Sequence, residues 1–163
     1  MKYREATISD FAQLKELGKI SYSEFSEVLD GEHWEKMYIF LDDEQVLKKL
    51  IFDSKVFVCE LSSKLIGMVY FVPSGSAYGK YEAEWSRIRY LGVNPEYRGR
   101  SIGKELTQLC IEEAKVRGEK FVALHTSEFM NTARKMYENL GFKQLSYFQH
   151  YGKKYWIYLL SIH

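Results

Sequence analysis

A short basic segment holds the residues of this sequence whose types and spacing best suit phosphate chemistry. Residues 92–106, GVNPEYRGRSIGKEL, leave an apolar strand-like run, break at Pro95 and become helical near Ser101. Between the break and the helix the chain carries two glycines and three basic residues, namely Gly99, Gly103, Arg98, Arg100 and Lys104. Backbone N–H groups and the positive end of a helix that meet at one loop bind a diphosphate without particular side chains. The segment therefore predicts a phosphate-binding loop.

Two familiar nucleotide-binding motifs do not fit this loop. A Walker A loop has four residues between its glycines and a Ser or Thr after its lysine. Here three residues separate the glycines, and Glu105 follows the lysine. A dinucleotide fingerprint needs three glycines in the pattern G-x-G-x-x-G, which Gly99 and Gly103 cannot supply. A glycine-bearing connector with surface arginines is the other interpretation that the segment allows.

The composition is that of an ordinary globular domain. The chain has 163 residues, 46% of them hydrophobic and 28% charged, and its formal net charge is +1. These values predict one domain over residues 1–163 and no nucleic-acid partner. No apolar run approaches the roughly 18 residues of a membrane helix, and the N-terminus lacks a signal-peptide pattern, so we expect a cytoplasmic protein with no membrane partner. Cys59 and Cys110 lie in apolar patterns, which predicts two reduced, buried thiols and no metal site.

Alternating strands and helices must position the loop. Strand patterns are expected at residues 2–7, 55–61, 64–72, 83–93 and 121–126, followed by a final hairpin that turns at Gly152. Helices are expected from Ser9-Asp10 onward and at residues 42–52, 101–117 and 130–140, with a broken aromatic helix at 20–41. We therefore predict one α/β domain with a mixed central sheet of about seven strands and helices on both faces.

The long strand contains an irregularity next to the loop. Leu91 and Val93 alternate as in an ordinary strand, but Ile88 is out of phase with them. A three-residue step in a period of two is typical of a β-bulge, and bulges often lie beside active sites. A central strand that is apolar on both faces would give the same pattern without a bulge.

Two segments of the chain, in this order, resemble the GNAT family of N-acetyltransferases. Residues 93–103 contain V-x-P-x-Y-R-G-R-x-I-G, which is similar to the family loop that cradles the pyrophosphate of acetyl-CoA. Residues 130–142, MNTARKMYENLGF, resemble the family's A-x-x-x-Y-E-x-x-G-F helix. With the strand pattern, the resemblance covers essentially the whole chain. It implies an acetyl-CoA-dependent N-acyltransferase in which a small-molecule or peptide amine attacks the thioester directly in a ternary complex.

The resemblance also implies which residues bind the cosubstrate, acetyl-CoA. They are Leu91, Gly92, Val93, Arg98, Gly99, Arg100, Ser101, Ile102, Gly103, Lys104 and Asn131. Ser101 departs from the family, which has a glycine there; a serine fits if its φ is negative, and its hydroxyl would then cap the helix or touch phosphate. Met130 stands where the family often has an asparagine. Asn131 follows it, either contacting the cofactor or facing solvent.

Tyr137 matches the family's proton donor to the departing coenzyme thiolate. Packing of the last helix is the other role open to this tyrosine. The resemblance further implies that the pantetheine arm pairs with the backbone of residues 91–93. A backbone N–H near Val93 would then stabilise the developing oxyanion.

The base that removes the amine proton is not at the family's usual positions. Those positions hold Arg87 and Arg89, and arginine cannot accept a proton. Glu84, with Glu82 beside it, becomes the candidate base, against the alternative of a solvated pair of carboxylates. His125 could face the same site, or it could be a histidine satisfied by neighbouring backbone.

The acceptor amine is not identified by the sequence. Aromatic residues at 22–40, the loop at 73–85 and the final hairpin are where an acceptor pocket is expected, although they could equally fill core and surface. A catalytically weak acetyl-CoA or CoA-binding sensor with the same fold is the alternative function. Either form is compatible with a monomer or a homodimer.

Overall fold

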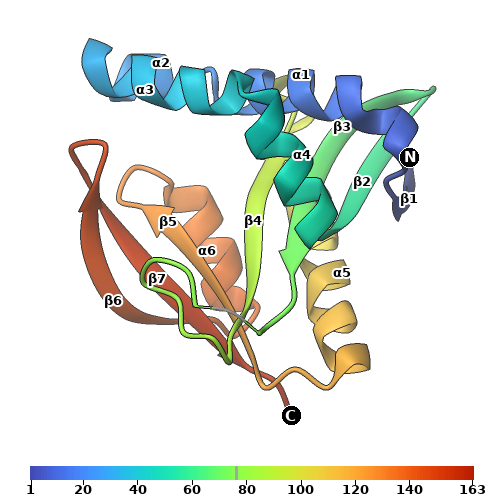
Figure 1. The fold of residues 1–163 in the computed structure, drawn as a ribbon, viewed down its shortest axis with the longest axis vertical. Helices are drawn as coiled ribbons and strands as arrows, with labels where there is room; N and C mark the ends of the chain where they lie inside the picture. Colours follow the sequence, from blue (N-terminus) through green and yellow to red (C-terminus); the bar gives the residue numbers. More distant parts are fainter. Residues whose placement is uncertain (76) are drawn as a thin grey trace.

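The computed structural model describes residues 1–75 and 77–163, and their strands form one mixed seven-stranded sheet in the order β1-β2-β3-β4-β5-β7-β6 (Figure 1). The strands are β1 Lys2–Glu5, β2 Lys55–Leu61, β3 Lys64–Val72, β4 Ser86–Val93, β5 Phe121–Ser127, β6 Lys143–His150 and β7 Lys153–Ser161. Neighbouring strands are antiparallel except β4 and β5, which are parallel. The α/β fold class and the mixed sheet predicted from the sequence are confirmed.

The helices lie between strands along the chain. They are η1 Ile8–Asp10, α1 Phe11–Tyr22, α2 Phe25–Val28, α3 Gly31–Asp42, α4 Glu44–Asp53, η2 Pro95–Tyr97, α5 Ile102–Arg117 and α6 Asn131–Asn139. Aspartates start two of them: Asp30 accepts a hydrogen bond from the His33 backbone N–H at α3, and Asp43 does the same for Gln45 at α4. Among the described residues, no helix combines the length and apolarity needed to cross a membrane.

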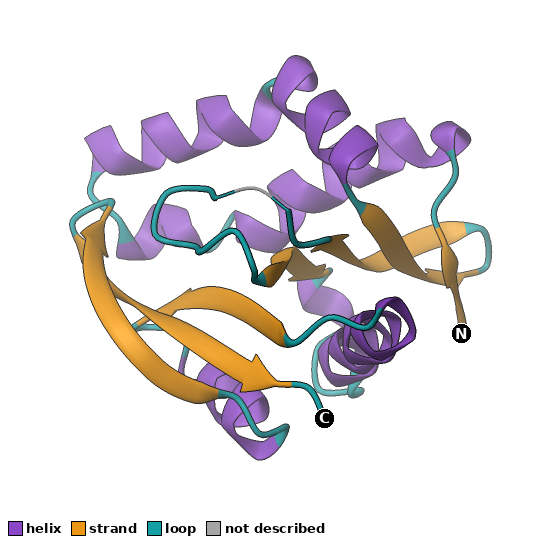
Figure 2. Ribbon diagram, turned by 60° about the horizontal axis from the view of Figure 1, so that its bottom comes forward, coloured by secondary structure: helices purple, strands orange, loops and turns teal. Residues whose placement is uncertain are grey.

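Helices cover both faces of the sheet (Figure 2). On one face, Leu14 and Leu17 of α1 and Leu50 of α4 pack against strand residues such as Met68. On the other face, α5 contributes its apolar stripe, including Leu106, to the larger core cluster. Each fully buried leucine of this kind contributes roughly 1.5–3 kcal/mol. The two layers therefore fix β3 and β4 between them.

β4 carries the predicted bulge. Met68 of β3 is opposite Gly92, but Tyr70, only two residues along β3, is opposite Arg89, so β4 has one extra residue. The extra residue is accommodated at Tyr90, whose φ of +49° lies in the left-handed region. The bulge interpretation is confirmed, and the apolar-on-both-faces alternative is not needed.

β4 and β5 are joined only at their beginning. Among the described residues, the paired positions are Ser86 with Val122 and Arg87 with Ala123. Beyond them the two strands diverge (Figure 1). β4 also begins later than the predicted residue 83, because the Trp85 N–H turns back to the Glu82 carbonyl. The bulge and the divergence together open the sheet at its centre.

Candidate functional site

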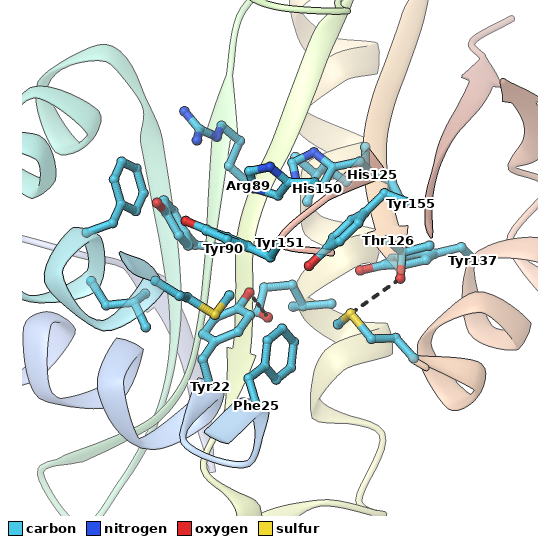
Figure 3. Close-up of a pocket in the computed structure, with 17 residues that line it drawn as sticks. Tyr22, Phe25, Arg89, Tyr90, His125, Thr126, Tyr137, His150, Tyr151 and Tyr155 are labelled. Carbon is cyan, nitrogen blue, oxygen red and sulfur yellow. Dashed lines mark hydrogen bonds between the residues drawn. The ribbon is translucent and has the colours of Figure 1, made fainter. Parts of the chain in front are cut away.

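A cavity of about 120 Å³ occupies the space between the diverging strands (Figure 3). The two strands supply part of its wall, namely Ile88, Arg89, Tyr90 and Leu91 from β4 and Leu124, His125 and Thr126 from β5. The rest comes from distant segments: Tyr22, Phe25, Met37, Phe40, Leu41, Met130, Tyr137, His150, Tyr151 and Tyr155. The cavity wall is therefore rich in aromatic side chains, and its polar side chains are five tyrosines, two histidines, Thr126 and Arg89.

Two of the aromatic regions that the sequence singled out, 22–40 and the final hairpin, line this cavity, and the 73–85 loop contacts one of its lining residues. From the α1–α3 segment, Tyr22 donates a hydrogen bond from its hydroxyl to the Leu91 carbonyl at 3.0 Å, which ties the end of α1 to the bulged part of β4. Phe25 packs edge-on against Phe129 with ring centroids 4.8 Å apart. From the 73–85 loop, the Tyr81 hydroxyl contacts His125 Nδ1 at 2.5 Å. Segments far apart in the chain thus build one wall.

The predicted phosphate loop lies between η2 and α5 and has an unusual backbone. Gly99 has φ +81° and Ser101 has φ +62°, so the chain visits the left-handed region twice within three residues. No side chain caps the start of α5, and the first N–H groups of a helix have no intrahelical partner. Such a loop presents several backbone donors to one space, which suits an anion.

Ser101 corrects the expectation made for it. We expected a negative φ, but the residue is left-handed, and its hydroxyl makes no capping hydrogen bond. A residue with a Cβ atom is strained in this region, and glycine is not. The family's preference for glycine at this position therefore has a direct physical reason here.

The side chains of the loop point to several different partners. Arg98 donates to both carboxylate oxygens of Glu24 at 2.8 Å and to the Ser21 carbonyl at 3.0 Å, so its charge anchors the loop to the end of α1. Arg100 stacks over Tyr97, with its guanidinium carbon 5.3 Å from the ring centroid. The loop's basic charge is thus partly used within the protein.

Gly103 links the loop to the central opening. A Cβ atom placed on it would lie 3.8 Å from Leu91 Cδ2, 3.9 Å from Met136 Cε and 4.0 Å from Val93 Cγ2. It therefore faces a slot between β4 and α6. Ile102, next to it, is buried in the core and holds the start of α5 in place. The missing side chain leaves the slot open toward the cavity wall at Leu91.

Tyr137 reaches the cavity from α6. It is 5% exposed, and its ring packs edge-on against Phe142 at a centroid distance of 5.8 Å. Its hydroxyl has no hydrogen-bond partner among residues 1–75 and 77–163, and Figure 3 shows it directed into the cavity. Burial raises the pKa of Tyr137, so the hydroxyl keeps its proton at neutral pH. The group is a proton or hydrogen-bond donor held inside the site.

Asn131 and Glu84 lie away from the cavity. Asn131 is exposed at the start of α6, and its side-chain oxygen accepts a hydrogen bond from Arg134. Glu84 is exposed in the turn before β4. Among the described residues, no aspartate or glutamate lines the cavity. The geometry therefore does not bring the candidate carboxylate base to the opening between the strands.

His125 does line the cavity, and its partner differs from the one expected. The expected backbone contact is replaced by the Tyr81 hydroxyl. His125 is accessible through the cavity yet surrounded by Phe148 and Tyr155. Burial, with a smaller effect of Arg89, lowers the pKa of His125 to about 4, so the imidazole is neutral at pH 7. His150 and Tyr151 also line the cavity but gave no sequence signal beyond the aromatic richness of the hairpin.

Comparison with known proteins agrees with the fold. Residues 15–142 match the acetyltransferase (GNAT) family. N-acetylaspartate synthetase of Xenopus tropicalis is 31% identical over 94 residues, which are 58% of this chain and 32% of that protein. An uncharacterized N-acetyltransferase of Methanocaldococcus jannaschii is 34% identical over 88 residues, 54% of this chain and 38% of that protein. The matched segments thus span only 32% and 38% of the length of these two relatives.

A solved structure gives the same fold over nearly the whole chain. The PaiA N-acetyltransferase of Thermoplasma acidophilum, crystallised with coenzyme A, superposes with a TM-score of 0.79 at 19% identity. The superposition covers 98% of both chains. From the family match, and with a fold that agrees with it, we conclude that this chain belongs to the GNAT acetyltransferase family.

Proposed function

We propose that the protein transfers the acetyl group of acetyl-CoA to an amine. The observation that carries the proposal is that three features follow one another in space. They are the left-handed loop at the uncapped start of α5, the part of β4 that β5 does not pair with, and the cavity that holds the Tyr137 hydroxyl. Family membership and the coenzyme A bound to the Thermoplasma protein support it.

The cosubstrate would lie along the loop and the opened strand. The backbone N–H groups of residues 99–104 would bind its diphosphate. The pantetheine arm would run past Gly103 and pair with the backbone of residues 91–93, which lies beyond the last β4–β5 pair. The acetyl group would then enter the cavity near Leu91.

The reaction forms a C–N bond and breaks a C–S bond. The amine nitrogen attacks the thioester carbonyl carbon, and a backbone N–H near Val93 stabilises the oxyanion. When the intermediate collapses, the sulfur leaves as a thiolate and the nitrogen loses one proton. A cysteine-like thiol has a pKa of about 8.5, below the raised pKa of Tyr137. We therefore assign to Tyr137 a hydrogen bond that stabilises the departing thiolate.

The amine proton needs another acceptor. A lysine-like amine has a pKa of about 10.4 and is mostly protonated at neutral pH, so it loses one proton before it attacks and a second when the intermediate collapses. The low pKa of His125, about 4, makes this residue a weak base. We propose that water in the mouth of the cavity takes the proton. Glu84 then acts from outside the cavity, at the end of a water chain that carries both protons away.

One observation favours the sensor alternative. No carboxylate lines the cavity among the described residues, so the site lacks a strong internal base. A sensor would bind acetyl-CoA through the same loop without turning it over. The enzyme and the sensor therefore bind acetyl-CoA alike and differ only in the rate of acetyl transfer.

Release of the coenzyme thiol separates the two functions. The protein would be incubated with acetyl-CoA and a panel of amines, and thiol release would be followed above the hydrolysis background. We expect amine-dependent release for at least one amine, with binding of acetyl-CoA in the micromolar range, equivalent to about −8 kcal/mol. Binding without amine-dependent release would favour the sensor. Absence of acetyl-CoA binding would overturn both.

A further inference from the structure

The rim of the cavity carries a positive charge that the proposed transfer does not use. Arg89 lines the cavity, and Figure 3 shows its guanidinium extending from the rim, away from Tyr137. Its guanidinium carbon lies 5.3 Å from the Tyr90 ring centroid and 5.0 Å from that of Tyr78. Arg89 is thus held between two aromatic rings at the mouth of the site.

Arg89 has no carboxylate within ion-pair distance among residues 1–75 and 77–163. Three other arginines pair with carboxylates: Arg4 with Asp10 at 2.8 Å, Arg98 with Glu24 at 2.8 Å and Arg117 with Glu113 at 2.7 Å. Arg87 lies close by, with its guanidinium carbon 5.2 Å from the same Tyr78 ring. The proximity of Arg89 helps lower the pKa of Arg87, after the larger effect of burial. An anion at this rim would relieve the repulsion.

The cavity disfavours an acceptor with several cationic groups. No aspartate or glutamate lines it in the described part of the chain, so a second ammonium group would find no counter-charge inside. At the mouth that group would meet Arg89. Aromatic faces can attract one cation, but the rim selects against a second. The charges therefore favour an acceptor with one amine and one anionic group.

The size of the cavity limits the body of the acceptor. Its volume is about 120 Å³. A dry engineered cavity of about 150 Å³ in another protein binds benzene. The walls here are aromatic, including Phe40, Tyr90 and Tyr155. One ring or one branched aliphatic group fits this space, whereas several linked sugar rings do not.

Resting on the proposed acetyl transfer, we propose that the acceptor is a primary amine with a compact apolar or aromatic body and a carboxylate that pairs with Arg89. The amine nitrogen approaches the thioester near Leu91. The body lies among the aromatic rings, and the carboxylate stays at the rim. Arginine binds a carboxylate through two parallel hydrogen bonds, which fixes orientation as well as charge.

The inference is tested with amines that differ only in the charged group. The first pair is 4-(aminomethyl)benzoate and benzylamine, and the second is phenylalanine and phenethylamine, so that two spacings of amine and carboxylate are sampled. 4-(Aminomethyl)benzylamine supplies the second cation. We expect kcat/KM for at least one carboxylate to exceed that of its uncharged partner by about tenfold or more, and the diamine to be the poorest acceptor. Equal or better use of the uncharged partners or of the diamine would overturn the inference.

A variant locates the effect at Arg89. Arg89→Gln should reduce the ratio of kcat/KM between the preferred carboxylate and its uncharged partner to near one, and Arg89→Lys should restore part of it. Arg117→Gln, an arginine on the far part of α5, is the matched control and should keep the ratio. An unchanged ratio in Arg89→Gln would overturn the assignment.

Calorimetric titration of the protein with acetyl-CoA tests the proposed function independently of the acceptor class that rests on it. If acetyl-CoA binds and only uncharged or dicationic amines react, acetyl transfer stands and the carboxylate preference falls. If no amine of the panel reacts although acetyl-CoA binds, the proposed acceptor class is wrong and the sensor function is favoured. Without acetyl-CoA binding, the proposed function itself fails.

Discussion

Tyr137 places one hydroxyl group inside an aromatic cavity, and its removal tests the role assigned to it. We expect Tyr137→Phe to keep the fold and the affinity for acetyl-CoA, because the variant loses one oxygen atom and little volume. A hydrogen bond to a charged group contributes about 1.5–3 kcal/mol. The single-turnover rate should therefore fall by about 10- to 150-fold.

The matched control for Tyr137 is another buried tyrosine on the neighbouring strand. Tyr158 donates its hydroxyl to Glu138 at 3.3 Å and does not line the cavity. Tyr158→Phe should leave the single-turnover rate unchanged. If Tyr137→Phe reacts as fast as the parent protein, Tyr137 takes no part in thiolate departure.

Substitution of Ser101 should change the stability of the protein independently of acetyl-CoA binding. With φ at +62°, the serine has a strained backbone, which glycine relieves. Because glycine also gains entropy in the unfolded chain, we expect Ser101→Gly to raise the free energy of unfolding by at most about 1 kcal/mol. Urea denaturation would measure the change. Ser101→Ala keeps the Cβ atom and should show no gain.

The same two variants report on the serine hydroxyl. Neither should change the affinity for acetyl-CoA by more than about threefold, since the hydroxyl makes no hydrogen bond that shapes the loop. A tenfold or larger loss of affinity in both variants would show that the hydroxyl binds phosphate.

Single residues were predictable where chemistry depends on sequence-local geometry. The glycines of the loop were singled out by their spacing, and Tyr137 by the resemblance of its helix to a family motif. The partner of Arg98 was not predictable, since Glu24 is 74 residues away in sequence. The hydrogen bond from the Tyr22 hydroxyl to the Leu91 carbonyl joins residues 69 positions apart and was not predictable for the same reason. Such contacts depend on how the helices dock on the sheet, which no local pattern encodes.

At the scale of elements, the slot between β4 and α6 depends on Gly103. Gly103→Leu should abolish acetyl-CoA binding, because the side chain would fill the slot. Gly103→Ala should weaken binding but keep the fold, since its Cβ would make only ordinary contacts at 3.8 Å or more. Alanine also favours a helix over glycine by about 0.5–1 kcal/mol. Affinity would thus fall while thermal stability holds or rises.

The control for Gly103 is a glycine of another helix. Gly31 begins α3, and a Cβ atom there would meet nothing within 4 Å. Gly31→Ala should leave the affinity for acetyl-CoA unchanged. Calorimetry and thermal unfolding on all three variants check the prediction. Parent-like binding by Gly103→Leu would place the cosubstrate elsewhere.

Most elements were predictable because each carries its own periodicity and its own boundary signals. α5, for example, ends at Gly118, which adopts φ +72° as a helix-terminating glycine should. The segment at 20–41 was described only as a broken helix, and the structure divides it among the end of α1, α2 and α3. Tyr22, Phe25 and Phe40 of this segment line the cavity, whereas its Trp34 and Tyr38 do not. The periodicity was therefore weak where the segment serves the site.

For the whole molecule, a buried ion pair near the N-terminus predicts how stability depends on pH. Arg4 of β1 binds Asp10 through two hydrogen bonds of 2.8 and 2.9 Å, and Asp10 is 5% exposed. The Arg4 guanidinium lowers the pKa of Asp10 from 3.8 to about 2. This shift corresponds to about 2 kcal/mol of stability. The stabilisation is complete above the unfolded-state pKa and is lost as the pH falls through about 2.

Asp10→Asn should therefore lower the free energy of unfolding by about 2 kcal/mol at pH 7 and reduce its pH dependence between about pH 4 and pH 2. Urea denaturation at several pH values would measure both effects. Asp53→Asn, which breaks an exposed pair with Lys49, is the control and should cost less than about 1 kcal/mol. A pH dependence in Asp10→Asn equal to that of the parent would contradict the assignment to this pair.

At the scale of the whole molecule, we propose that the fold brings an amine to the thioester of bound acetyl-CoA and that the acetyl group passes directly to the amine. The most direct measurement is a rapid-quench single turnover with the protein in excess, followed by intact-mass analysis of the protein and of the amine. With acetyl-CoA alone, direct transfer predicts no acetylated protein. When an accepted amine is added, acetylated amine and free coenzyme should appear together in equal amounts. An acetylated protein that then passes its acetyl group to the amine, or bound acetyl-CoA that yields no product with any amine, would contradict it.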